Sequence, residues 1–494
     1  MSQVKEKMNI TPNRLKDKKV LVVGLARSGT GAANLLSSLG AEVTVTDRKP
    51  RNSLKSEIEK LSPVVKVVSG GNPEELFSDA DLIVVSPGVP LDIPQITAAV
   101  SRGIPVIGEL ELAYQTAVGY GFSEHENSAH GIPTFIGITG TNGKSTTTTL
   151  VDLMLKMSGF RTLLCGNIGR ALTEEINKLG FTSEGPVLTG IDRIVAEVSS
   201  FQLEAVFEFR PKVAAVLNIT PDHLDRYRSM DEYVRAKAKI FENQGEGDRL
   251  VLNADDPLVM DMFETGRGRH DGLMPDIYFF SRDREVEGVY LKNGVIYCNL
   301  SHATSIPSHF PIMTADEVRI RGLHNLENAM AASLISILSG SRTEDVREVL
   351  MDFPGLEHRL EVAGEYRGVI FINDSKGTNV GAVMKSLESF ENLILIMGGT
   401  DKGSDFTALR DLVESRVKTL ILIGEAKEKI ASEIGNSTET ILAADMYDAV
   451  RISVSRASGG DVVMLSPGCA SFDMFDDFED RGRSFKEAVR KVAG

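Results

Sequence analysis

The sequence has few of the features that mark secreted, disulfide-bonded or membrane proteins. Its 494 residues include only three cysteines, Cys165, Cys298 and Cys469. They lie far apart and form no CxxC pair, so neither a disulfide framework nor a zinc ribbon is expected. No apolar run approaches the ~18 residues that a membrane-spanning helix needs, and the N-terminus lacks the apolar core of a signal peptide. We therefore expect a soluble, cytoplasmic protein with no membrane partner.

Positive charge is also scarce. The chain has 54 lysines and arginines against 69 aspartates and glutamates, which gives a formal net charge of −15. Wrapping a nucleic acid requires clustered cations that neutralise phosphates, so no nucleic-acid partner is expected. A local basic site for one small anionic ligand is compatible with this charge.

What is abundant is the material for several α/β domains. Hydrophobic residues make up 42% of the chain, enough for packed cores, and the length predicts about three domains of roughly 150 residues. Short apolar runs closed by glycine are typical of buried parallel strands, and helix-like segments follow them. We predict an α/β fold of three consecutive domains: a Rossmann-like N-terminal domain (1–120), a P-loop-like central domain (131–354) and a Rossmann-like C-terminal domain (355–494).

The segment GITGTNGKSTTTTL (137–150) is typical of a phosphate-binding loop between a strand and a helix. Glycines let the backbone approach phosphates, and the N–H groups and dipole of the following helix favour anions. Lys144 would reach the outer phosphates, and Ser145 would face a Mg²⁺ ion. The strict P-loop pattern fails, because Ile138 stands where its first glycine belongs. The alternative is a glycine-rich turn with no ligand.

The first domain begins with VLVVGLARSGTGAANLL (20–36), which is close to a dinucleotide-binding fingerprint. Its middle glycine is replaced by Ala26, whose methyl group would obstruct a pyrophosphate. We favour a modified nucleotide site in which Ser28, Arg48 and Lys49 donate to a diphosphate. NAD binding is one alternative, and a solvated charge cluster at 47–51 is another.

Three residues of the central domain are candidates for work beside the phosphate loop. Glu197 ends an apolar strand and could reach a Mg²⁺ ion, which prefers oxygen ligands; a capping or surface glutamate is the alternative. His223 follows another apolar run, and a lone histidine is more often structural. Lys237 and Lys239 lie two apart on an expected helix, so they face different directions. Only one of them can point into a site, and both could be plain surface lysines.

These motifs together resemble those of the Mur ligases, the enzymes that extend the peptide of bacterial cell-wall precursors. The resemblance runs from about residue 24 to residue 485 and is greatest to the members that add D-glutamate. It is carried by the following segments: GTNGKSTT (140–147), EVSSFQLE (197–204), NITPDHLDRY (218–227), YVRAKAKIF (233–241), GLHNLENAMAA (322–332), GLEHRLE (355–361), NDSKGTN (373–379) and LSPGCASFDMFDDFEDRGRSF (465–485).

The resemblance implies an ATP-dependent ligase that joins D-glutamate to UDP-N-acetylmuramoyl-L-alanine through an acyl phosphate. It implies small-molecule substrates only, two Mg²⁺ ions, a carbamylated Lys237 and a monomer. A sibling ligase for another amino acid, an NAD-dependent oxidoreductase and a non-catalytic nucleotide switch are the alternatives.

The resemblance also implies roles for individual residues. The implied catalytic residues are Lys144, Glu197, His223 and Lys237, and the implied metal ligands are Ser145, Glu197, His223 and Lys237. The implied ATP-binding residues are Gly140, Thr141, Asn142, Gly143, Lys144, Ser145, Thr146, Asn325, Asn328, Arg359 and Asp374. The implied precursor-binding residues are Arg27, Ser28, Asp47, Arg48, Lys49, Gly88 and Asn167. The implied D-glutamate-binding residues are Thr378, Lys402, Ser471 and Phe478.

Overall fold

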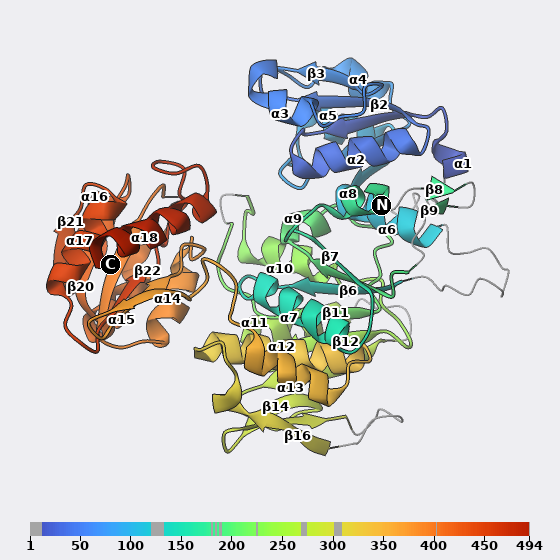
Figure 1. Cartoon of the computed structure of the whole chain (residues 1–494). Coiled ribbons are helices and arrows are strands. Elements are labelled where there is room, and N and C mark those ends of the chain that lie inside the picture. Colours follow the sequence, from blue (N-terminus) through green and yellow to red (C-terminus); the bar gives the residue numbers. More distant parts are fainter. Residues whose placement is uncertain are drawn as a thin grey trace.

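The computed structural model describes most of the chain. The described residues are 12–119, 133–178, 181–182, 185–186, 190–223, 226–267, 274–300, 309–401 and 403–493. They form three α/β domains in chain order, drawn in blue, in green to yellow, and in orange to red (Figure 1). The predicted fold class is therefore confirmed, while the exact domain boundaries stay predictions. None of the described helices is both long and apolar enough to cross a membrane.

The first domain has a five-stranded parallel sheet in the order β3-β2-β1-β4-β5. Two inner strands are buried apolar runs, VLVV (20–23) and LIVV (82–85), because helices cover both faces of a parallel sheet. The strands are β1 (Lys19–Val23), β2 (Glu42–Asp47), β3 (Lys66–Ser69), β4 (Leu82–Val85) and β5 (Val106–Gly108). The helices are α1 (Pro12–Leu15), α2 (Arg27–Ser38), α3 (Lys55–Ile58), α4 (Glu74–Ser78), α5 (Pro94–Ser101) and α6 (Glu109–Gly119).

The central domain has a nine-stranded sheet in the order β16-β15-β14-β13-β12-β11-β6-β10-β7. Among the described strands of this sheet, antiparallel pairing is confined to β14 with β15 and β15 with β16. The strands are β6 (Thr134–Thr139), β7 (Thr162–Gly166), β10 (Arg193–Glu197), β11 (Val213–Val216), β12 (Arg249–Asn253), β13 (Asp276–Ser281), β14 (Gly288–Lys292), β15 (Val295–Asn299) and β16 (His309–Thr314). The helices are α7 (Lys144–Met157), α8 (Leu172–Lys178), α9 (Ser200–Leu203), α10 (Met230–Ala238), α11 (Pro257–Arg267), α12 (Leu323–Leu338) and α13 (Thr343–Asp352). A separate small pair joins β8 (Phe181–Thr182) to β9 (Gly185–Pro186).

The third domain has a six-stranded sheet in the order β17-β18-β22-β19-β20-β21, in which only β17 runs antiparallel. The strands are β17 (Glu361–Tyr366), β18 (Val369–Asn373), β19 (Leu393–Gly398), β20 (Val417–Ile423), β21 (Glu439–Leu442) and β22 (Val462–Leu465). The helices are α14 (Val380–Glu388), α15 (Arg410–Arg416), α16 (Lys427–Ile434), α17 (Met446–Arg456) and α18 (Phe478–Ala493).

The hydrophobic cores do not follow the three domains one to one. One cluster of buried side chains runs from the first domain into the central domain, and it includes Leu36 of α2 and Ile176 of α8. The third domain has two clusters of its own, one on each face of its sheet, and neither includes a residue of the central domain. The first two domains thus share a core that the third domain does not join.

Candidate active site

The loop after β6 wraps the N-terminus of α7. Gly143 caps this helix with φ of 81°, and a Cβ at this position would lie 2.1 Å from Oδ1 of Asn328. Only glycine fits there, so the loop backbone packs directly against α12. The first turn of α7 leaves N–H groups without helical partners, and the helix dipole favours an anion at this end. The loop therefore has the construction that phosphate binding requires.

Two lysines meet at one carbonyl oxygen of this loop. The Nζ of Lys144 donates to Gly140 O at 2.9 Å and to Thr141 O at 2.8 Å. The Nζ of Lys237, whose side chain is only 1% exposed, donates to the same Gly140 oxygen at 2.8 Å. Burial holds the pKa of Lys237 well below its usual range, and the charge of Lys144 lowers this pKa further. Lys239 instead donates to Glu204 O at 2.5 Å, so of the two competing lysines Lys237 is the one that reaches the loop.

Glu197 lies beside this pair at the end of β10, the strand next to β6. The side chain is 2% exposed, and its Oε1 accepts a hydrogen bond from Nδ2 of Asn167 at 2.7 Å. Its Oε2 is buried and has no hydrogen-bond partner among the described residues. A buried carboxylate oxygen without a partner is costly, but it suits a hard cation. Within the described part of the chain, no three His, Cys, Asp or Glu side chains form a complete metal site.

His223 lies on the loop that follows β11 (Figure 1 shows this strand beside β6). Its backbone has φ of 56°, a left-handed conformation that costs a residue other than glycine on the order of 1–3 kcal/mol. The carboxylate of Asp222 accepts from the His223 backbone N–H at 2.9 Å, and its Oδ2 lies 3.6 Å from His223 Nε2. The ring also packs 4.7 Å from the ring of Phe201, measured between centroids.

A cleft of about 600 Å³ opens at the carboxyl ends of the strands of the first domain. All seven residues predicted to bind the precursor line it, Asn167 being the one that the central domain contributes. Asp47 accepts from the backbone N–H groups of Leu25 and Lys49 at 2.7 and 2.8 Å, so this carboxylate shapes the loops around the cleft. Arg27 donates to Gly169 O at 2.5 Å and thereby links the first domain to the central one.

A second, narrow pocket lies between the phosphate loop, α12 and the third domain. Five of the predicted ATP-binding residues line it together: Asn142, Gly143, Asn328, Arg359 and Asp374. Asn325 does not line this pocket, but its Oδ1 accepts a hydrogen bond from Asn328 Nδ2 at 3.3 Å. Asp374 accepts from two serine hydroxyls, and burial raises its pKa to about 6.

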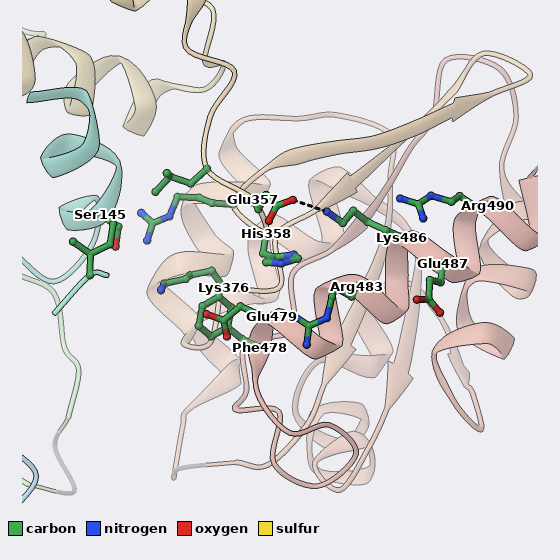
Figure 2. Close-up of a pocket in the computed structure, with 13 residues that line it drawn as sticks. Ser145, Glu357, His358, Lys376, Phe478, Glu479, Arg483, Lys486, Glu487 and Arg490 are labelled. Atoms are coloured by element: carbon green, nitrogen blue, oxygen red, sulfur yellow. Dashed lines mark hydrogen bonds and ion pairs between the residues drawn. The ribbon is translucent and has the colours of Figure 1, made fainter. Parts of the chain in front are cut away.

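A third pocket, of about 520 Å³, separates α7 from α18. Figure 2 shows Ser145 on one side, facing Lys376, His358 and Arg483 of the third domain. Among the residues predicted to bind D-glutamate, Phe478 lines this pocket, while Thr378 and Ser471 do not. Lys402 lies outside the described residues.

The sequence interpretation missed three polar residues, two of which line these pockets. Lys376 lines two of them, and its Nζ lies 4.1 Å from the Phe478 ring centroid. It follows a strand end, so the rule that selected Thr378 could have found it. Asn218 holds the phosphate loop by accepting from Asn142 N at 2.8 Å and donating to Asn142 O at 3.0 Å. Arg481 is 1% exposed and donates to Ser375, Cys469 and Ala470; no pattern in the sequence indicates that an arginine is buried.

Comparison with known proteins decides the family. Three protein-family models match this chain: the Mur ligase MurD-like N-terminal domain (residues 18–108), the Mur ligase middle domain (138–336) and the Mur ligase glutamate ligase domain (358–469). A UDP-N-acetylmuramoylalanine–D-glutamate ligase of Geotalea daltonii is 44% identical over 97% of this chain and 99% of its own length. The chain belongs to the Mur ligase family. The enzyme of the same name from Clostridioides difficile is 41% identical over 97% of this chain and 99% of its own length.

Solved structures of Mur ligases share the fold. The UDP-N-acetylmuramate–alanine ligase MurC of Thermotoga maritima matches 96% of this chain and 99% of its own, with a TM-score of 0.55 and 18% identity. The MurF ligase of the same organism, solved in complex with ADP, matches 97% of both chains with a TM-score of 0.55 and 15% identity. At this identity the likeness concerns the fold alone.

Proposed function

We propose that this Mur ligase uses ATP to join D-glutamate to UDP-N-acetylmuramoyl-L-alanine, as a cytoplasmic step of peptidoglycan precursor synthesis. The observation that carries the proposal is the convergence of Lys144 and Lys237 on one oxygen of the phosphate loop, with the Glu197 carboxylate close enough to act on the pKa of both lysines. This loop lies between a nucleotide-sized cleft of the first domain and a basic pocket of the third. The name of relatives that match nearly the whole chain, UDP-N-acetylmuramoylalanine–D-glutamate ligase, supports the choice of substrates.

The proposed reaction proceeds in two displacements. A carboxylate oxygen of the precursor's alanine attacks the γ-phosphorus of ATP. The bond between this phosphorus and the bridging oxygen breaks, ADP is released, and an acyl phosphate is formed. The amine of D-glutamate then attacks the acyl carbon, phosphate leaves, and the amine loses a proton to form the amide. Lys144 and the N–H groups of α7 stabilise the charge that develops on the transferring phosphoryl group. Water must be excluded, because it would hydrolyse the acyl phosphate.

The chain offers oxygen and nitrogen ligands for Mg²⁺ around the same loop. Ser145, Glu197, His223 and a carbamate on Lys237 would hold two ions, and the unpartnered Oε2 of Glu197 fits such a ligand set. When bound, the ions would neutralise phosphate charge during transfer. Asn167 would orient Glu197 through its bond to Oε1, as outer residues orient metal ligands elsewhere.

Carbamylation of Lys237 would remove a conflict of charge. A protonated Lys237 would oppose both Lys144 and a metal ion, whereas a buried neutral amine can add to CO₂ and release one proton. The product is a carbamate, whose oxygen atoms are anionic ligands. The burial of Lys237 and its depressed pKa favour the neutral amine that this addition requires.

We assign the substrates to the three pockets as follows. The precursor's UDP would lie in the cleft of the first domain, against Arg27, Ser28, Asp47, Arg48, Lys49, Gly88 and Asn167. The phosphates of ATP would lie on residues 140–146, and its base and ribose beside Asn325, Asn328, Arg359 and Asp374. D-Glutamate would bind the third domain near Thr378, Lys402, Ser471 and Phe478.

Phosphate release from ATP in the presence of UDP-N-acetylmuramoyl-L-alanine tests the proposal across a panel of D- and L-amino acids. We expect release with D-glutamate and strong rejection of L-glutamate, because inversion at Cα moves the amine or the side-chain carboxylate away from its partner. Lys144→Ala should abolish release without changing the melting temperature. Equal kcat/KM for both enantiomers, or release with another amino acid only, would contradict the substrate assignment.

A further inference from the structure

The third domain reaches the loop that follows β11 in the central domain through the side chain of Asn379. This residue is the N-cap of α14, where its Oδ1 accepts from the backbone N–H of Ala382 at 2.8 Å. Its Nδ2 points the other way and donates across the domain boundary to Oδ2 of Asp222 at 3.2 Å. One amide therefore fixes a helix of the third domain and a carboxylate of the central domain at the same time.

Asp222 also contacts its neighbour in the chain, His223. Its Oδ1 accepts from the backbone N–H of His223 at 2.9 Å, and its Oδ2 lies 3.6 Å from His223 Nε2. The backbone of His223 has φ of 56°, a conformation that persists only where surrounding contacts determine it. The carboxylate of Asp222 supplies such a contact, and Asn379 in turn holds the carboxylate.

The contact of Asn379 with Asp222 joins two of the proposed sites. It follows Thr378, which we assign to the amino acid, and His223 belongs to the proposed metal and ATP centre. We propose that Asn379 is a positioning residue that orients His223 through Asp222, so that docking of the amino-acid domain completes the centre. This inference rests on the proposed function for the role of His223, but the contact itself does not depend on which amino acid is added.

Two substitutions of Asn379 remove its contact with Asp222 while they keep the cap of α14. Serine and aspartate both cap helices about as well as asparagine. In Asn379→Ser the side chain is too short to reach Asp222, and in Asn379→Asp a second carboxylate opposes it. We expect kcat to fall about 10-fold in Asn379→Ser, as when outer partners of ligands are lost, and further in Asn379→Asp. KM for ATP and for the precursor should stay within about twofold, because neither site loses a contact.

A swapped pair tests whether Asp222 is the partner. In the double variant Asp222→Asn with Asn379→Asp, the amide and the carboxylate exchange places, and the hydrogen bond can form in the opposite direction. The double variant should be more active than the two single effects predict, which is the signature of a direct interaction. Asp445→Ser is the matched control, because Asp445 caps α17 by the same kind of bond and is exposed; it should leave kcat and KM unchanged.

The ring of His223 gives a readout that needs no turnover. The eight histidines can be isotope-labelled, and the NMR signal of the His223 ring is the one that is lost in His223→Gln. This signal should shift in Asn379→Ser, return toward the wild-type position in the swapped pair and stay in place in Asp445→Ser. Unchanged kcat and an unchanged signal in Asn379→Ser, or simple additivity in the swapped pair, would overturn the proposal. If the wild type shows no ligase activity, the proposed function fails, while the histidine signal still decides whether Asn379 positions His223.

Discussion

The two junctions of the central domain are built differently. Where it meets the first domain, α8 packs on α2 and α6, and buried side chains of both domains form one hydrophobic cluster. Where it meets the third domain, the described hydrogen bonds and ion pairs are few and polar: Asn379 to Asp222, Ser389 to His324 and Lys385 to Glu327. Figure 1 shows the third domain beside the central one, with α14 on the side that faces the central domain.

This difference predicts which parts of the molecule move. Separating the first two domains would expose several apolar side chains, each worth about 1.5–3 kcal/mol. Separating the third domain would expose Leu356, which packs partly buried against the central core, and would break partly solvated polar contacts that contribute about 0–1 kcal/mol each. We therefore expect the precursor cleft and the phosphate loop to form one fixed unit, and the third domain to turn as a rigid body that brings its pocket to this unit.

The largest effect is expected from Lys237, the side chain of the fixed unit to which we assign a part in the chemistry. Lys237→Ala should lower kcat on the order of 10³-fold, because charge stabilisation of a phosphoryl group is worth at least that much. Small carboxylic acids should restore part of the activity by replacing the carbamate oxygens. Lys239→Ala is the control and should lose little. The reverse pattern in steady-state assays would show that the wrong lysine has been assigned.

Core substitutions should separate the two junctions by calorimetry. Ile176→Ala and Ile430→Ala each truncate a fully buried side chain, which costs about 2–5 kcal/mol. Ile176 lies in the shared cluster, so its loss should lower the melting transition of the first two domains together. Ile430 lies in the third domain, so its loss should move only that domain's transition. If Ile176→Ala shifted the first domain and left the central one unchanged, the shared core would not act as one unit.

The stability of the third domain should depend on pH through the buried carboxylate of Asp374, which we assign to ATP binding. The pKa of Asp374 rises from 3.8 to about 6 because the group is buried, so the folded protein holds this proton more tightly than the unfolded chain. Stability should therefore decline between pH 4 and pH 6, and the ionised carboxylate should cost about 3 kcal/mol above that range.

Asp374→Asn tests this cost while keeping an acceptor for both serine hydroxyls. The variant should be the more stable protein at pH 7.5, and the gain should vanish near pH 4. Denaturant unfolding of the third domain at both pH values measures the difference. A variant that is less stable at pH 7.5 would show that the carboxylate does not strain the fold.

The smallest effects come from single polar contacts at each junction. Thr173 donates its N–H and its hydroxyl to buried Glu109 at the first junction, so Thr173→Val should cost about 1–3 kcal/mol. The hydroxyl of Ser389 lies 3.5 Å from His324 Nδ1 at the second junction. Ser389→Ala should change the unfolding free energy by less than about 0.5 kcal/mol. Equal effects in denaturant titrations would remove the distinction between the junctions.

Much of the fold could be predicted because its signals are local. Buried parallel strands are uniform apolar runs, and the phosphate loop carries its glycines and lysine in one segment. The hairpin between β14 and β15 also has a local signal, since Asn293 and Gly294 both have positive φ, as a two-residue turn requires. The pattern of apolar runs alone predicts parallel strands, so the antiparallel edge of the central sheet was not predicted.

The rest depends on contacts between segments far apart in the chain. The helix α8 belongs to the central domain by its place in the sequence, but it packs on α2 and α6 of the first domain. No local pattern indicates this contact. That Lys237 and Lys144 share the oxygen of Gly140 depends on the packing of α10 against the loop. Arg481 shows the limit most plainly, because its sequence context is that of an exposed, charged helix and only the folded domain buries it.

Distances between spin labels test the central claim most directly. The three native cysteines are buried, so labels can be attached to cysteines introduced at the exposed positions Glu59, Glu264 and Glu428, one in each domain. On addition of a non-hydrolysable ATP analogue, the precursor and D-glutamate, the distance between residues 264 and 428 should shorten and its distribution narrow. The distance between residues 59 and 264 should stay the same. A change of similar size in both distances, or in the first pair of domains alone, would contradict a fixed unit with one moving domain.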